Sequence, residues 1–262
     1  MKRGLLVYER EDAAQNSRFI ELSREWAERF GLSLELCYAD ALESSVYGMD
    51  FALLRTRAPV LHSLVEASGA RCFNSARLNA VANDKMLCYD VLRDHVPMLT
   101  SLDALFYDSP PFLPCVVKSA HGHGGKNVYL VYDKPSYLSA LSNIAPDRAI
   151  LQPFADPGRD KRIYVIGGKP RCAMLRTSKK DFRSNYKLGG SAEAVSISAG
   201  EADIVNAVQA LLPMDYAGVD IIYEHGRALL GELEDPVGAR MVYEHAGIDI
   251  IRELIEYIAS CL

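Results

Sequence analysis

Residues 218–234 have the sequence GVDIIYEHGRALLGELE, in which two largely apolar runs flank the turn dipeptide His225-Gly226. This pattern predicts a β-hairpin with strands over 218–223 and 227–234. Residues two apart on a strand share a face, so Glu232 and Glu234 point the same way, and the partner strand can add Asp220 to that face.

Three clustered carboxylates are costly unless a cation neutralises them, and oxygen ligands suit Mg²⁺. The common alternative is a solvated sheet face. The apolar neighbours Ile221, Leu229 and Leu230 instead predict a hairpin that is at least half buried. We therefore expect Asp220, Glu232 and Glu234 to form a metal site.

A second predicted hairpin precedes this one, with strands over 162–166 and 170–176 around Gly167-Gly168. It carries a basic set made of Arg162 and Arg176, followed along the chain by Arg183 and Asn185. An arginine fork binds carboxylate or phosphate in two-point fashion. An exposed surface arginine is the default interpretation for each one, and their convergence on an anion is left open.

A glycine-rich loop, HGHGGKN at 121–127, joins predicted strands over 115–118 and 128–132. Glycines let backbone N–H groups approach phosphates closely, and Lys118 just upstream adds a positive charge. A flexible hairpin turn explains the loop alone equally well. The loop lacks the Walker spacing, and no helix follows it as in a dinucleotide-binding fingerprint.

The first part of the chain alternates strands with helices, which predicts a small parallel sheet covered by helices. The strands are expected at 5–9, 32–38, 51–55 and 71–74, and the helices at 16–31 and 59–69. Further helices are predicted at 75–96, from Pro135 onward, at 202–212 and at 249–261.

Composition limits the class of protein. The 262 residues are 49% hydrophobic and 24% charged, and their net charge of -5 argues against a nucleic-acid binder. No apolar run approaches the roughly 20 residues of a membrane span. The six cysteines form no C-x-x-C pair, which favours buried free thiols and a cytoplasmic location.

The motifs, in this order, resemble the ATP-grasp superfamily, and within it the RimK-like amino acid and glutamate ligases. The resemblance extends over roughly residues 74 to 250. The first 70 residues match the family only in their general alternation of strands and helices. It is carried by Asn83-Asp84-Lys85, Pro114–Lys118, Gln152-Pro153-Phe154, Asp160-Lys161-Arg162, Asp181–Asn185 with Gly189-Gly190, Gly218-Val219-Asp220 and Glu232-Leu233-Glu234.

The resemblance implies an α/β (α+β) architecture, the ATP-grasp fold, in which two α+β lobes grip ATP after a small parallel-sheet domain. We expect the N-terminal pre-ATP-grasp domain at 1–77. The central subdomain with the glycine-rich loop is expected at 78–148, and the C-terminal subdomain with the metal and nucleotide site at 149–262.

The resemblance also implies roles for single residues. Lys85, Lys118, Gly124 and Gly125 would contact the ATP phosphates. The adenine hinge would comprise Gln152, Pro153, Phe154 and Ala155, with Asp160 at the ribose and Arg162 also at the nucleotide. Asp220, Glu232 and Glu234 would hold one or two Mg²⁺, with Mn²⁺ as an alternative. Arg176, Arg183 and Asn185 would face the transferred phosphate and the acceptor carboxylate.

Two departures from the family pattern stand out. The usual E-x-N triplet is Glu232-Leu233-Glu234 here, so a carboxylate replaces an amide. The Pro-Gly that normally follows is rearranged within Asp235–Arg240, a loop that lies near substrate in the family. Arg240 is therefore a candidate for a distinct carboxylate site.

The implied function is ATP-dependent joining of a carboxylate to an amine through an acyl-phosphate, with release of ADP and phosphate. The alternatives are a small-molecule kinase or carboxylase on the same fold, a nucleotide-binding regulator with a degenerate site, and a purely structural domain. The expected partners are a small carboxylate and amine, or a peptide or protein substrate, without nucleic acid or membrane. Assembly into a homo-oligomer is left open.

Overall fold

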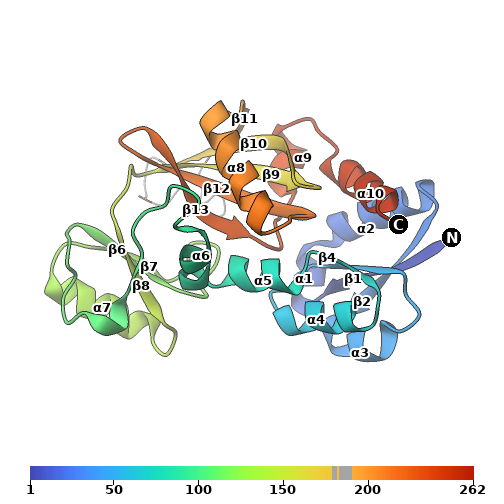
Figure 1. Ribbon diagram of the computed structural model, residues 1–262, viewed down its shortest axis with the longest axis horizontal. Helices are drawn as coiled ribbons and strands as arrows, with labels where there is room; N and C mark the ends of the chain where they lie inside the picture. Colours follow the sequence, from blue (N-terminus) through green and yellow to red (C-terminus); the bar gives the residue numbers. More distant parts are fainter. Residues whose placement is uncertain (179–181, 183–190) are drawn as a thin grey trace.

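The computed structural model describes residues 1–178, 182 and 191–262, which form three sheets. In Figure 1 the N-terminal sheet lies at one end of the molecule and the sheet carrying β6 to β8 at the other. The largest sheet lies above and between them. The predicted Arg183 and Asn185 lie outside the described residues.

The N-terminal sheet is parallel, with strand order β2-β1-β3-β4, which confirms the small parallel sheet expected there. Its central strands are apolar runs because helices cover both faces and leave no solvated side. The strands are β1 (Lys2–Tyr8), β2 (Leu32–Tyr38), β3 (Phe51–Leu54) and β4 (Arg71–Phe73). The helices are α1 (Arg10–Gln15), α2 (Ser17–Arg29), α3 (Leu42–Ser45) and α4 (Pro59–Ala67), with a 3₁₀ turn, η1 (Ala39–Ala41).

The single helix predicted over 75–96 is wrong, because the structure has two, α5 (Ala76–Asn83) and α6 (Lys85–Leu92). Asp84 between them has extended backbone, and its side chain accepts hydrogen bonds from Met86 N and Leu87 N at 2.9 and 3.0 Å. Asp84 is thus the N-cap of α6. The break makes Lys85 the first residue of α6.

The second sheet has strand order β5-β8-β6-β7, with α7 (Lys134–Ile144) packed on it. Its strands are β5 (Leu102–Asp103), β6 (Cys115–Ser119), β7 (Val128–Val131) and β8 (Ala149–Pro153), and a 3₁₀ turn, η2 (Ala104–Phe106), follows β5. The predicted hairpin around the glycine-rich loop is confirmed as β6–β7.

The domain boundary expected between residues 148 and 149 would separate β8 from the rest of this sheet. β8 pairs with β6 from Ser119↔Ala149 to Cys115↔Pro153. Hydrogen bonds to β6 tie β8 to the central subdomain. A boundary between β8 and β9 keeps both sheets whole.

The third sheet contains antiparallel pairs in the order β11-β10-β9-β12-β13 and confirms both C-terminal hairpins. Its strands are β9 (Arg159–Ile166), β10 (Lys169–Thr177), β11 (Ser191–Val195), β12 (Tyr216–Glu224) and β13 (Arg227–Glu234). The helices of this part are α8 (Ala199–Leu211), α9 (Arg240–His245) and α10 (Ile250–Ser260).

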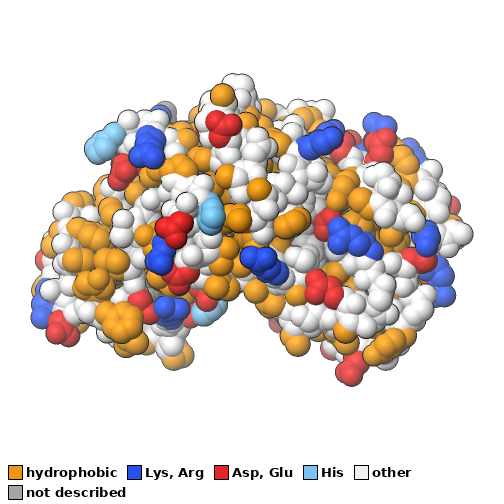
Figure 2. Space-filling view, viewed as in Figure 1, with side chains coloured by type: hydrophobic (Ala, Val, Ile, Leu, Met, Phe, Trp, Pro, Cys, Tyr) orange, Lys and Arg blue, Asp and Glu red, His pale blue; other side chains and the backbone are white. Residues whose placement is uncertain are grey.

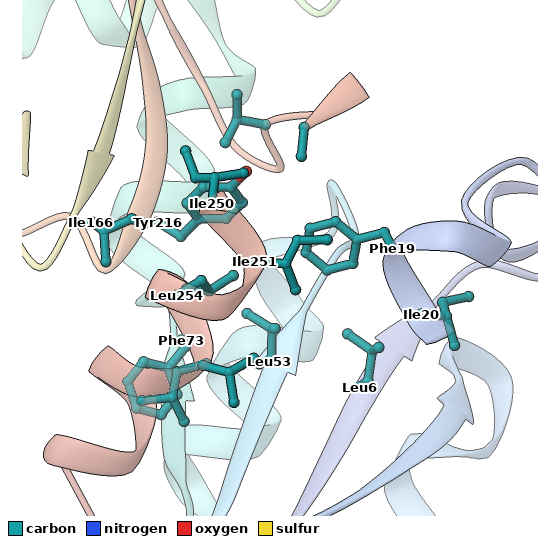
Figure 3. Packing of buried hydrophobic residues seen from close by; sticks show 14 of the residues in the cluster. Leu6, Phe19, Ile20, Leu53, Phe73, Ile166, Tyr216, Ile250, Ile251 and Leu254 are labelled. Atoms are coloured by element: carbon teal, nitrogen blue, oxygen red, sulfur yellow. The ribbon is translucent and has the colours of Figure 1, made fainter. Parts of the chain in front are cut away.

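A shared apolar core joins the N-terminal sheet to the third sheet through α10 (Figure 3). Phe19 of α2 stacks on Tyr216 of β12 with ring centroids 6.4 Å apart. Ile251 and Leu254 of α10 are fully buried in the same cluster. Burial of this much apolar surface fixes the two parts against each other.

Several large apolar side chains are exposed on the central subdomain, over which apolar atoms gather at the left of Figure 2. They are Leu105, Phe106, Leu113, Tyr132 and Leu138. Across the described parts of the chain, every helix is too short or too polar to cross a lipid bilayer.

Candidate active site

A cavity of about 1010 Å³ lies between the second and third sheets. Most of the predicted site residues line it: Lys85, Lys118, Gly124, Gly125, Gln152, Pro153, Phe154, Ala155, Asp160, Arg176, Asp220 and Glu232. The fold thus brings together, around one cavity, residues that are separated by nearly 150 positions in the sequence.

The three carboxylates meet because of the register of β12 and β13. Asp220 lies directly opposite Glu232, and Gly218 lies opposite Glu234. One oxygen from each of the three carboxylates lies within 4.8 Å of the others. We call Asp220, Glu232 and Glu234 the acidic cluster.

Two buried arginines on the neighbouring strands hold this cluster. Arg162 of β9 lies opposite Asp220, and its Nε and Nη2 donate to Oδ1 and Oδ2 of Asp220, both at 2.7 Å. Its Nη2 also donates to Glu234 Oε2 at 2.5 Å. Arg176 of β10 donates to Asp220 Oδ2 at 2.7 Å and, with Nε and Nη2, to both oxygens of Asp160.

The arginines decide how the carboxylates are charged. Burial by itself would raise the pKa of Asp220, but Arg162 and Arg176 lower it to about 2. The pKa of Glu234 is raised by burial and by its acidic neighbours, even though Arg162 opposes the rise. Asp220 is thus firmly ionised, whereas the charge of Glu234 depends on the positive groups around it.

Arg162, predicted as a nucleotide contact, is not among the residues that line the cavity, and its role at the nucleotide stays a prediction. Its side chain is 8% exposed and lies behind the carboxylates rather than on the cavity wall, because the cross-strand pair with Asp220 draws the guanidinium under them. Arg176 and Asp160 do line the cavity, but they form an ion pair in which Arg176 donates to the carboxylate of Asp160. Their predicted roles at phosphate, carboxylate and ribose stay predictions.

The two lysines also line the cavity. Lys118 of β6 is partly buried on the cavity wall, and desolvation lowers its pKa to about 8, with Glu232 opposing the shift and Lys85 adding to it. Lys85 donates to the carbonyl of Gly122, and its Nζ lies 3.8 Å from Glu232. Two ammonium groups therefore share the cavity with Asp220 and Glu232, and that of Lys85 lies within ion-pair distance of Glu232.

The predicted hinge segment forms another wall. Gln152 is buried on β8, and its Nε2 donates to Ser101 Oγ at 2.7 Å, so that side chain supports the wall from behind. Phe154 makes an edge contact with Phe182, their ring centroids 6.1 Å apart. Leu99, Val116 and Ile222 add apolar surface. An apolar slot beside a backbone edge suits a flat aromatic base.

The glycine-rich loop has backbone that only glycine adopts freely, with φ of 66° at Gly124 and 75° at Gly125. Sequence reasoning missed Asp147, which anchors the base of this loop. Its carboxylate accepts from Ser119 Oγ and from the backbone of His121, and it lies 2.7 Å from His121 Nδ1. No sequence signal marks Asp147, because it comes from the segment before β8 and meets the loop only in the folded sheet.

The acidic cluster fits a magnesium ion. Its donors are carboxylate oxygens within one small volume, which is the ligand type that Mg²⁺ prefers. Asp220 accepts three hydrogen bonds, and a carboxylate has about four lone-pair positions, so room for a cation remains. Glu232 lies on the cavity wall and is the most accessible member, with its side chain 34% exposed.

The rearranged loop after Glu234 has a different place. Asp235 is 2% exposed, and its carboxylate accepts from Asn74 Nδ2 at 2.9 Å and Asn79 Nδ2 at 2.8 Å. We call these three residues the Asp235 junction. Arg240 begins α9 on the surface and does not line the cavity, so the structure gives no support to a carboxylate site there.

Residues 106–258 match the model of the RimK-like ATP-grasp domain. The chain belongs to the RimK-like ATP-grasp family. It is 30% identical over 199 residues to a protein of Histophilus somni (strain 2336) named "Probable alpha-L-glutamate ligase". The match spans 71% of this chain and 67% of that protein, so the chain corresponds to about two thirds of this relative's length.

Solved structures of the ATP-grasp fold cover nearly the whole chain. D-alanine–D-alanine ligase from Bacillus anthracis, solved with ATP, has a TM-score of 0.76 at 16% identity, covering 99% of this chain and 97% of its own. The ATP-grasp ligase PsnB, solved with a precursor peptide and AMPPNP, has a TM-score of 0.71 at 18% identity, covering 98% and 96%.

Family membership confirms the predicted fold class and the predicted reaction class. This RimK-like protein is an ATP-grasp enzyme that forms carbon–nitrogen bonds between a carboxylate and an amine, with ATP and Mg²⁺. The regulator, kinase and carboxylase alternatives are not favoured.

Proposed function

We propose that this RimK-like ligase activates a substrate carboxylate as an acyl-phosphate and transfers the acyl group to the amine of an amino acid. The observation that carries the proposal is that Lys85, Lys118, Asp220 and Glu232 all line the large cavity. An arrangement of two ammonium groups together with carboxylates suits a metal-bound triphosphate, because each charge of the ligand meets its opposite.

The chain's own residues supply positioning and charge. Lys118 and Lys85 hold the phosphate oxygens, and the hinge from Gln152 to Ala155 holds the base in its apolar slot. The acidic cluster would hold one or two Mg²⁺, which when bound screens the phosphate charge from the attacking carboxylate. Arg162 and Arg176 keep Asp220 ionised and oriented.

The reaction proceeds in two displacements. A carboxylate oxygen attacks the γ-phosphorus, the bond to the β-phosphate oxygen breaks, and ADP leaves. The neutral amine then attacks the acyl carbon, the carbon–oxygen bond to phosphate breaks, and the nitrogen loses one proton. Binding the reactants in one cavity replaces collisions with a fixed geometry.

The glycine-rich loop would exclude water from the acyl-phosphate. Gly122 to Gly125 line the cavity next to Lys85 and Lys118, so the loop covers the phosphate end. Its base is fixed by Asp147, while Gly124 and Gly125 allow backbone rearrangement over a ligand. Water exclusion protects the intermediate from hydrolysis.

The substrate class follows from the relatives. The Histophilus somni protein is named a probable α-L-glutamate ligase, which supports an α-amino acid as the amine. PsnB was solved with a precursor peptide, which supports a peptide among the carboxylate substrates. We accordingly propose an amino acid and either a small or a peptide carboxylate, and a cytoplasmic location in keeping with the free, mostly buried cysteines.

The test is phosphate release from Mg-ATP with pooled L-amino acids, dicarboxylates and peptides, followed by analysis of the nucleotide product. We expect amine-dependent release of phosphate and ADP. Formation of AMP would contradict the acyl-phosphate route, and ATP binding without turnover in any pool would favour a regulator. The Lys118→Ala variant serves as the inactive control.

A further inference from the structure

A second, smaller cavity of about 320 Å³ adjoins the phosphate end of the large one. The two cavities share Lys85, Gly122, His123 and Glu232 as walls. A ligand in the small cavity therefore lies next to the expected position of the transferred phosphate. The N-terminal domain also contributes to the small cavity, since Arg57 from the loop after β3 lines it.

Arg57 differs from the other arginines near these cavities. Arg162 and Arg176 already hold carboxylates, Arg159 lies 3.5 Å from Asp156, and Arg55 donates to the carbonyl of Val237. Within the part of the chain that the structure describes, no carboxylate or carbonyl engages the Arg57 side chain. Its two-point donor fork is free to bind an external carboxylate.

The backbone beneath Arg57 is held in place. The carbonyl of Thr56 accepts from Asn79 Nδ2 at 3.0 Å, and Asn79 is a member of the Asp235 junction. Pro59 begins α4 two residues after Arg57. An exposed arginine on a fixed stem can reach into the cavity without ordering a mobile loop, which lowers the entropy cost of binding.

The small cavity has charges of both signs. Arg57 and Lys85 lie on its walls together with Glu232, Glu234 and the buried Asp235. Arg57 and His123 both line the small cavity, and the pKa of His123 is lowered first by burial and then by the charge of Arg57. A ligand with a carboxylate at one end and an amine at the other, that is an α-amino acid, matches this distribution.

We propose that the small cavity binds the amine substrate as an α-amino acid, with Arg57 holding its α-carboxylate. The amine then points toward the wall at Glu232 that both cavities share, where the acyl-phosphate forms. Arg57 is on this basis a specificity-determining residue from the N-terminal domain. The inference rests on the proposed function and adds the place and the anchor of one substrate.

The experiment compares the intact protein with Arg57→Ala, Arg57→Lys and Arg77→Ala. Arg77 is an exposed arginine on α5 outside both cavities, so its removal changes the net charge equally. Phosphate release is measured with pooled L-amino acids and, separately, with the corresponding α-amides, while dicarboxylates and peptides supply the acyl group in both cases.

We expect the intact protein to prefer the amino acids over their amides. Arg57→Ala should raise KM for the amino-acid pool about 10- to 100-fold with little change in kcat or in KM for ATP, since it removes a charge-assisted contact made on binding. Arg57→Lys should fall between, and Arg77→Ala should match the intact protein. Equal use of acids and amides by the intact protein would overturn the inference and leave the ligase function standing.

A binding measurement separates the two proposals. In the presence of Mg-ADP, the L-amino-acid pool should raise the melting temperature of the intact protein and of Arg77→Ala but not of Arg57→Ala. If the melting temperatures follow this pattern but no variant or pool shows turnover, the ligase function is contradicted and the amino-acid site at Arg57 is supported. A melting temperature unchanged by amino acids in the intact protein, or raised equally in Arg57→Ala, would overturn the site.

Discussion

Two neighbouring residues of one strand end, Glu234 and Asp235, carry carboxylates into two different environments. Glu234 belongs to the acidic cluster, where its partner is the charged guanidinium of Arg162. Asp235 belongs to the Asp235 junction, where its partners are the neutral amides of Asn74 and Asn79. Both residues line the small cavity, but Asp235 is only 2% exposed and packs between the N-terminal domain, α5 and β12.

The difference shows how to separate a functional acid from a structural one. Both pKa values are raised chiefly by burial, so titration does not distinguish them. The surroundings do, because the Asp235 carboxylate is nearly fully buried and held by neutral amides, whereas Glu232 of the acidic cluster lies on the wall of the large cavity, where a cation can reach it. We expect changes in the acidic cluster to affect turnover and changes at the junction to affect stability.

The largest effect should come from removing a group that faces the triphosphate. Lys118→Ala and Glu232→Ala should each lower turnover by about 10²- to 10³-fold or more, because each deletes a charge aimed at the phosphates or the metal. Phosphate release measures the loss, and circular dichroism checks that the fold is intact. Full activity in either variant would remove the site assignment.

At the junction the expected effect is on folding. Asp235→Ala should lower the free energy of unfolding by about 2–5 kcal/mol, since the buried amides of Asn74 and Asn79 lose their acceptor. Urea denaturation measures it, with Asp94→Ala, at an exposed aspartate in the turn after α6, as the control. If Asp235→Ala is as stable as this control, or if its folded fraction is inactive, then Asp235 does not have the purely structural role assigned to it here.

The pH dependence of nucleotide binding should report on Lys118. Its pKa in the free protein is about 8, below the ordinary value, so the side chain is charged below that pH and loses its proton above it. A triphosphate binds the ammonium form, and binding above pH 8 must therefore take up a proton. We expect the Kd for ATP to rise as pH passes about 8, approaching tenfold per unit.

Titration calorimetry from pH 7 to 9.5 checks this dependence. Lys118→Arg keeps its charge throughout that range and should bind ATP with a Kd that changes little. A Kd for the intact protein that stays constant across the range would show that another group carries the phosphate contact.

The smallest effect should follow Glu234→Asn, which restores the amide found in the usual family triplet. Asn retains one oxygen ligand, and Arg162 still has Asp220 as a partner. We expect turnover within about tenfold of the intact protein and a higher Mg²⁺ concentration for half-maximal activity. A loss as large as that of Glu232→Ala would place Glu234 among the essential ligands.

Local patterns predicted most of the architecture. Apolar runs punctuated by Gly167-Gly168 and His225-Gly226 gave both C-terminal hairpins, and the ordered motifs gave the family and the residues that line the cavity. The prediction of one helix over 75–96 was wrong at Asp84, where one helix ends and the next begins. The helical sequence pattern runs through this position without a break, so only the backbone conformation of Asp84 shows that it is an N-cap.

The sequence by itself determined the kinds of group at this site, since strand alternation places Glu232 and Glu234 on one face and spacing alone brings Lys118 beside a glycine-rich loop. Only the tertiary structure decided their charge partners and neighbours. Cross-strand register set Arg162 opposite Asp220, and domain packing brought Arg57 to the small cavity that Glu234 and Asp235 also line. Such contacts join residues far apart along the chain, and no local rule encodes which pairs will meet.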